Sequence, residues 1–185
     1  MFRVVLSLFF LGFSLSGIAA ETEKRFFQPF TEGANQAPFK IKAVLQGNCF
    51  KQSKSMRRED AWQCRANNQT FDPCFKKPGS EKTLYCPESP WNGDSTVIEA
   101  DIIVDNHLFD FINMAESLPW VLLLDNGVRC MRTQHQSVFD QQPIEYVCQD
   151  ESILFGRLQR CRNQWSMLRY DGSSTDTVNI QQVWF

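Results

Sequence analysis

Hydrophobic and polar positions alternate most regularly just after the middle of the chain. Ile98, Ala100, Ile102 and Val104 are all apolar, whereas the positions between them include two acidic residues. A period of two residues is typical of a strand with one buried face. We therefore predict a half-buried strand over residues 97–104.

The alternation then gives way to a helical period. Apolar residues recur at spacings of three, one and three, which place them on one face of a helix: Leu108, Phe111, Ile112 and Ala115. Asn106 or Asp105 can cap the first turn of this short helix. A second helical turn is expected over residues 57–63.

An Asn-Gly pair predicts a hairpin further along. Asp125-Asn126-Gly127 separates the apolar segments 120–124 and 128–132, and Asn-Gly favours a type I′ turn because both residues tolerate positive φ. Further segments have the composition of strands: residues 144–148, 153–155, 165–170 and 178–185.

The first half of the chain has a weaker pattern. Residues 21–40 contain aromatic residues without a period and are interpreted as an extended arm, and residues 41–45 as a short strand. Residues 46–96 carry four cysteines and many turn signals, so we expect loops there. The whole pattern predicts a β-rich α+β fold, a single disulfide-stapled domain over residues 41–185 with an antiparallel sheet and one or two short helices.

Residues 1–20 have the three parts of a secretory signal peptide. Arg3 supplies a positive charge, residues 4–15 are apolar apart from small residues, and Ala19 or Ala20 offers a small residue for cleavage. An uncleaved anchor is the alternative, but the run is shorter than the ~20 residues of a membrane span. We expect an exported protein, periplasmic or extracellular, that is not transmembrane once processed.

The composition excludes several classes of protein. The net charge of −2 and 13% aromatic residues are typical of a globular chain and give no basic footprint for nucleic acid. Residues 40–82 carry ten Lys/Arg against four Asp/Glu, and residues 83–185 carry six against fourteen. A basic face for an acidic polysaccharide or lipid headgroup is one interpretation. The simpler interpretation is that two oppositely charged halves meet within one fold, or that these charges lie on solvated surface.

The seven cysteines all follow the predicted signal peptide, and an exported chain is expected to oxidise them. Six paired cysteines allow about fifteen pairings for each choice of the unpaired one. We favour pairing between sequence neighbours, which closes short loops that each contribute roughly 3 kcal/mol. The pairs are Cys49 with Cys64, Cys74 with Cys86, and Cys130 with Cys148.

Cys161 is then left over, among Arg157, Arg160 and Arg162. Positive neighbours favour the thiolate, so a reactive thiol is one functional interpretation. An intermolecular disulfide that links a dimer is another. The simpler interpretations are a buried inert thiol, or a partner in a different pairing.

No motif in the chain assigns a reaction. The nucleophile-elbow, zinc-protease and phosphate-loop motifs are absent, and no paired metal-ligand spacing occurs. We expect no metal, no cofactor and no catalytic residue. A triad would need His107 or His135, and Glu99 with Asp101 could form an acid–base pair on one strand face. In each case a solvated surface residue is the simpler interpretation.

Several motifs follow one another in an order that resembles a known group of proteins. They are Cys49-Phe50, Arg58-Glu59-Asp60-Ala61-Trp62-Gln63-Cys64, Asp72-Pro73-Cys74-Phe75 and Cys86-Pro87. Over roughly residues 45–185 the chain resembles a family of small uncharacterised bacterial secreted or extracytoplasmic proteins. The resemblance implies three sequential disulfides and no particular activity, and Cys161 departs from it.

A cluster in this region combines charged and aromatic residues: Arg58, Asp60, Trp62, Asp72 and Trp91. Trp and Arg are common anchors, so it is a candidate binding patch; turn formation by the aspartates and a small tryptophan core is the simpler interpretation. We hypothesise a secreted, non-enzymatic binding or envelope-associated module whose partner is an unknown protein or an envelope component such as a polysaccharide. The alternatives are a secreted hydrolase with an unrecognised site and a virulence or toxin-like factor.

Overall fold

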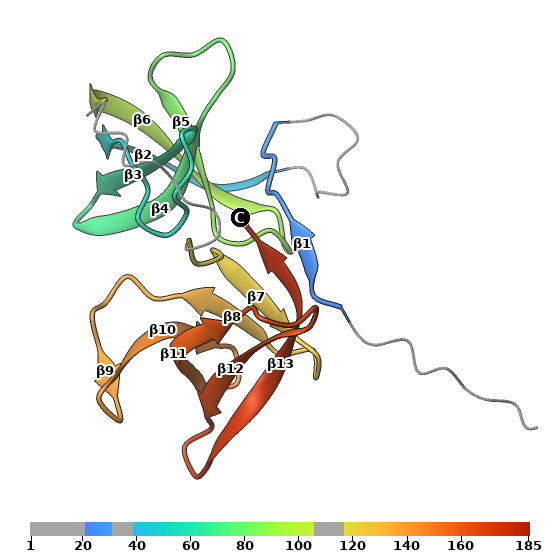
Figure 1. Cartoon of the computed structure of the whole chain (residues 1–185). Coiled ribbons are helices and arrows are strands. Elements are labelled where there is room, and N and C mark those ends of the chain that lie inside the picture. Colours follow the sequence, from blue (N-terminus) through green and yellow to red (C-terminus); the bar gives the residue numbers. More distant parts are fainter. Residues whose placement is uncertain (1–20, 31–38, 106–116) are drawn as a thin grey trace, which may run out of the picture.

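The protein folds into two closed β-barrels that follow one another along the chain (Figure 1). The computed structural model describes residues 21–30, 39–105 and 117–185, and within these ranges it contains strands and no helix. The α+β prediction is therefore wrong, and two barrels replace the single antiparallel sheet with short helices. A sheet that closes on itself buries its own apolar face, so it needs no helix to cover it.

The first barrel consists of β2 (Lys40–Phe50), β3 (Ala61–Ala66), β4 (Gln69–Lys76), β5 (Thr83–Pro87) and β6 (Asp94–Val104). Successive strands are antiparallel, and β6 closes the barrel on β2 in parallel. The parallel closure follows from the odd number of strands, because the first and the last then point the same way. The prediction of loops over residues 46–96 is wrong, since β3, β4 and β5 lie there.

Disulfides fill much of the interior of the first barrel. Its buried residues are Cys49, Trp62, Cys64, Ala66, Cys74, Leu84, Cys86, Ile98 and Ala100. The Cys49–Cys64 bond joins β2 to β3, and the Cys74–Cys86 bond joins β4 to β5. A core with so few large side chains depends on such cross-links for its stability.

The second barrel is larger and closes on itself through an antiparallel pairing of its last strand with its first. Its strands are β7 (Val121–Leu124), β8 (Arg129–Arg132), β10 (Gln142–Cys148), β11 (Ile153–Gln159), β12 (Trp165–Tyr170) and β13 (Thr175–Trp184). The short β9 (Val138–Phe139) forms a hairpin with β10. The third disulfide, Cys130–Cys148, joins β8 to β10, so all three favoured pairs are present.

The predicted half-buried strand is β6, but the face of the strand that carries the buried side chains changes part-way along it. Ile98 and Ala100 are buried, whereas Ile102 is 55% exposed. Ala100 and Ile102 pair with consecutive residues of β2, so Asp101 is an extra residue in the ladder. Such a bulge moves each later side chain to the other face. The predicted apolar face is therefore correct only as far as Ala100.

The predicted hairpin joins β7 to β8, with a different turn. Leu122 pairs with Cys130, and the Gly127 N–H donates to the Leu124 carbonyl at 3.0 Å. Gly127 has a φ of 85°, whereas Asn126 does not have a positive φ. The turn is a three-residue loop that ends in a glycine bulge. The type I′ prediction is wrong because it needs positive φ at two central residues.

Residues 21–30 pack against both barrels. β1 (Glu23–Arg25) pairs in parallel with β13 (Figure 1), and the buried Thr22 donates its hydroxyl to the Ile180 carbonyl at 2.6 Å. Beyond β1 the chain enters a buried cluster, here called the junction core: Phe27, Met56, Ala61, Phe75, Trp120, Val121 and Trp184. Because this cluster takes residues from the arm and from both barrels, the two barrels share buried apolar surface.

Of the two predicted helical segments, one is absent from the structure and the other lies outside the described residues. Residues 57–63 contain no helical turn, because Ala61 and Trp62 already pair with β4. The predicted apolar face of the second helix lies in residues 106–116, outside the described part. Within the described ranges, no helix has the length and apolar character that crossing a membrane requires.

Candidate functional site

The five residues of the candidate binding patch lie in three places. Arg58, Asp60 and Trp62 line an open hollow of about 810 Å³ beside the arm. Asp72 lies beneath the loop between β2 and β3. Trp91 packs between the barrels, with its ring 5.4 Å from that of Trp184 and 5.1 Å from the Arg129 guanidinium. The indole Nε1 of Trp91 is buried without a hydrogen-bond partner among the described residues.

Arg58 holds the arm and the C-terminal residue against the first barrel. Its guanidinium donates to both carboxylate oxygens of Asp60, at 2.9 and 2.6 Å. It also donates to the backbone carbonyls of Phe27 and Phe185. The same group lies 5.6 Å from the centre of the Phe75 ring. A guanidinium with so many internal partners stabilises the junction core.

Asp72 organises the loop between β2 and β3. Its carboxylate accepts hydrogen bonds from the Ser53 hydroxyl, the backbone N–H groups of Lys54 (2.9 Å) and Ser55 (3.3 Å), and the Gln63 amide (3.1 Å). Burial raises the pKa of Asp72 above its ordinary value, and the four donors oppose that rise without cancelling it. Asp72 therefore fixes the position of residues 53–55.

We expect Asp72→Asn to destabilise the protein by about 1–3 kcal/mol, because an amide N–H₂ would face backbone donors. Folding raises the pKa of Asp72, so the folded state binds this proton more tightly than the unfolded chain. Its contribution to stability is therefore present at low pH and is lost as the pH rises through the folded-state pKa. In urea unfolding from mildly acidic to neutral pH, the wild type should lose stability more steeply than Asp72→Asn. The exposed Glu81→Gln is the control and should keep the wild-type slope.

A polar cleft lies between the two barrels. Its volume is about 960 Å³, which is in the range of ligand-binding pockets. The loop between β2 and β3 forms one wall, and the segment from β8 to β10 forms the other. Half of the lining side chains carry hydroxyl or amide groups: Gln52, Ser53, Ser55, Ser117, Thr133, Gln134, Gln136 and Ser137. Such groups both donate and accept hydrogen bonds.

Hydrogen bonds hold the two walls of the cleft together. Arg132 Nη1 donates to the Lys54 carbonyl at 3.2 Å, and the Gln134 amide donates to the Ser55 hydroxyl at 3.3 Å. Asp72 supports the same loop from beneath. The cleft is thus formed before any ligand binds, which lowers the entropy cost of binding.

Charges in the cleft come from both walls. Lys54 and Arg57 lie on the first wall, and Arg132, His135 and Glu145 lie on the second. Burial raises the pKa of Glu145, and the nearby Arg132 charge opposes this rise. With three permanent cations against one carboxyl group, the cleft favours an anion.

The uneven charge along the sequence nearly disappears when it is counted by barrel. Residues 40–104 carry ten Lys/Arg against eight Asp/Glu, and residues 117–185 carry six against seven. Ion pairs such as Lys42–Asp94 and Arg169–Asp176 lie within one barrel. Opposite net charges therefore do not hold the two barrels together. The apolar junction core joins them.

The candidate catalytic residues are dispersed. His135 and Glu145 line the same cleft, but no hydrogen bond of the described residues involves either side chain. Glu99 accepts a hydrogen bond from the Thr83 hydroxyl, and Asp101 is the bulged residue of β6. His107 lies outside the described residues.

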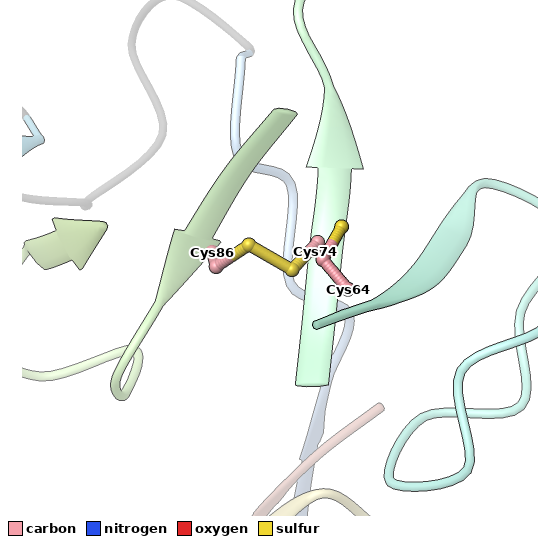
Figure 2. A group of neighbouring side chains, drawn as sticks. All are labelled: Cys64, Cys74 and Cys86. Carbon is pink, nitrogen blue, oxygen red and sulfur yellow. A yellow bond between two sulfur atoms is a disulfide. The ribbon is translucent and has the colours of Figure 1, made fainter. Parts of the chain in front are cut away.

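Three cysteine sulfurs lie within 4.8 Å of one another inside the first barrel, those of Cys64, Cys74 and Cys86 (Figure 2). Three thiolates at this spacing could hold a metal ion. Here Cys74 is bonded to Cys86 and Cys64 to Cys49, and thiolates, not disulfide sulfurs, are the usual cysteine ligands. The arrangement is two neighbouring structural disulfides.

Cys161 is exposed and unpaired in the segment between β11 and β12, so its thiol is not buried. Its neighbour Arg160 lies 4.8 Å from the Trp165 ring and donates to the Ser117 carbonyl at 2.5 Å. Arg160 therefore has partners of its own. A dimer linked through Cys161 stays a prediction.

Sequence reasoning missed the cleft because its walls are far apart in the chain. Gln134 and Ser55, which bond across it, are 79 residues apart. The polar run from Thr133 to Ser137 was a detectable signal, but a run of this kind indicates only a loop.

Comparison with known proteins adds no relative. No family model, no curated protein and no solved structure matches the chain. The family resemblance and the dimer therefore stay predictions, and the three disulfides indicate an oxidising, extracytoplasmic environment.

Proposed function

We propose that the protein is an exported, non-enzymatic binding protein of the periplasm or extracellular space, and that its ligand occupies the cleft between the barrels. The observation that carries this proposal is a preformed cleft of about 960 Å³ in which amide and hydroxyl groups from both walls make up half of the lining side chains. Convergent polar groups of this kind orient a ligand through hydrogen bonds. The disulfides support the extracytoplasmic location, where such bonds persist.

A secreted hydrolase is the second candidate, because His135 and Glu145 line the same cleft. A catalytic histidine is normally oriented by a hydrogen bond to a carboxylate or carbonyl group. Neither of these side chains has a hydrogen-bond partner among the described residues. The lining therefore favours recognition over turnover.

The cleft can be tested by filling it. We expect the purified protein to bind one or more members of an array of soluble neutral and acidic oligosaccharides. Gln136→Trp, which places a large ring at an exposed position of the cleft wall, should weaken that binding by at least about tenfold. Gln181→Trp makes the same change at an exposed position of β13 and should bind like the wild type.

Equal binding by both variants would place the ligand elsewhere. Absence of binding to every member would contradict an oligosaccharide-binding cleft. Cleavage of a bound oligosaccharide, seen as a change in its mass, would favour the hydrolase, and His135→Asn should then abolish the cleavage.

A further inference from the structure

The loop between β2 and β3 presents two cations that form no ion pair with an acidic side chain in the described part of the chain. Residues 51–58 form the densest basic run of the chain. Lys51 lies 3.4 Å from an aspartate oxygen and Arg58 lies 2.6 Å from another, so both charges are paired. Lys54 and Arg57 are exposed, line the cleft and form no ion pair with a described residue. The unpaired positive charge of the run is thus concentrated at the cleft.

The opposite wall adds a third cation and only one acidic residue. Arg132 is half-buried and donates across the cleft to the Lys54 carbonyl at 3.2 Å, which places its guanidinium beside the loop that carries Lys54. Glu145 is the one carboxylate residue in the lining, and Arg132 is the cation that acts on it. An anion that enters the cleft therefore meets positive charge from both barrels.

Neutral hydrogen-bonding groups surround these cations. Gln52 lies on the wall of Lys54 and Arg57, and Gln134 and Gln136 lie across from it. Glutamine amides pair well with sugar hydroxyls, since both partners donate and accept. Cations that share a cleft with such amides match a polymer that carries both carboxylates and hydroxyls.

We infer that the cleft binds an acidic polysaccharide, with sugar carboxylates at Lys54 and Arg57 and sugar hydroxyls at the glutamine amides. This inference rests on the proposed function and adds the class of ligand to it. A lipid headgroup could use the same cations, but it would leave the amide-lined wall without a role. An acidic peptide would likewise offer fewer hydroxyl partners.

The probe for the test is a hexamer of galacturonic acid, titrated calorimetrically at low ionic strength. The Lys54→Gln and Arg57→Gln double variant should bind it about two- to thirtyfold more weakly than the wild type, because two exposed charge contacts are lost. The control is the double variant Lys77→Gln and Lys82→Gln. It removes two exposed cations near the turn between β4 and β5, away from the cleft, and should bind like the wild type.

Each other result overturns the inference in a recognisable way. An equal loss in both double variants would indicate attraction to net charge alone. Stronger binding to phosphatidylglycerol vesicles than to the hexamer would indicate a membrane surface, and stronger binding to polyglutamate would indicate an acidic peptide. If the hexamer fails to bind while a neutral oligosaccharide binds in a manner that Gln136→Trp abolishes, the ligand class is wrong and the proposed binding cleft is retained.

Discussion

Phe27→Ala is expected to destabilise the protein by about 3–5 kcal/mol, the usual cost of truncating a buried phenylalanine. Phe27 is only 3% exposed, and its ring lies 5.5 Å from Phe75 of the first barrel and 5.3 Å from Trp120 beside the second. Its removal would leave a cavity in the junction core, where both barrels meet. Urea unfolding followed by tryptophan fluorescence measures the effect, because Trp120 and Trp184 belong to this core.

The neighbouring Phe26 provides a matched control. Its side chain is 60% exposed, so Phe26→Ala should change the free energy of unfolding by less than about 1 kcal/mol. If the two variants were equally stable, the arm would not be part of the folded core. A second, separate unfolding transition in Phe27→Ala alone would show that Phe27 couples the barrels.

The second barrel was largely predictable from the sequence, and the first was not. The strands of the second barrel have local signals, such as the apolar segments on either side of Asp125-Asn126-Gly127. In the first barrel, β4 contains Pro73, and its inward side chain near that point is Cys74 instead of a large apolar residue. Closure of a barrel also depends on the register of strands far apart, which no local pattern contains.

The disulfides were predictable for a physical reason. In an up-and-down arrangement, consecutive strands lie side by side, so cysteines that are neighbours in sequence face each other. Cys49 pairs directly with Cys64 in the β2–β3 ladder, and Cys130 with Cys148 in the β8–β10 ladder. The residues that face each other across the cleft are not neighbours in sequence, so no such rule predicts which of them meet. Asp72 drew attention as a candidate binding residue, but its carboxylate supports the loop that presents Lys54 to the cleft.

Removing both disulfides of the first barrel should unfold that barrel. Each closes a loop of 12 to 15 residues, and loss of such a bond costs about 2–5 kcal/mol. Replacing all four cysteines by alanine therefore lowers the free energy of unfolding by up to about twice that amount. The changes are Cys49→Ala, Cys64→Ala, Cys74→Ala and Cys86→Ala. It leaves Trp62, Leu84 and Ile98 as the large side chains of the barrel's core, which is too little apolar area for a stable fold.

The second barrel provides the comparison, because Cys130→Ala with Cys148→Ala removes one cross-link from a core that retains Leu122, Tyr146, Leu154 and other large residues. Amide hydrogen exchange should show lost protection in β2 to β6 of the quadruple variant, and retained protection in β7 to β13 of the double variant. Retained protection of β2 to β6 in the quadruple variant would mean that strand pairing and the junction core suffice for the first barrel. Its disulfides would then resist reduction or proteolysis without being needed for folding. Loss of protection confined to β2 to β6 would instead show that the wall bearing Lys54 and Arg57 exists only in an oxidised protein, which makes oxidation a condition for forming the cleft.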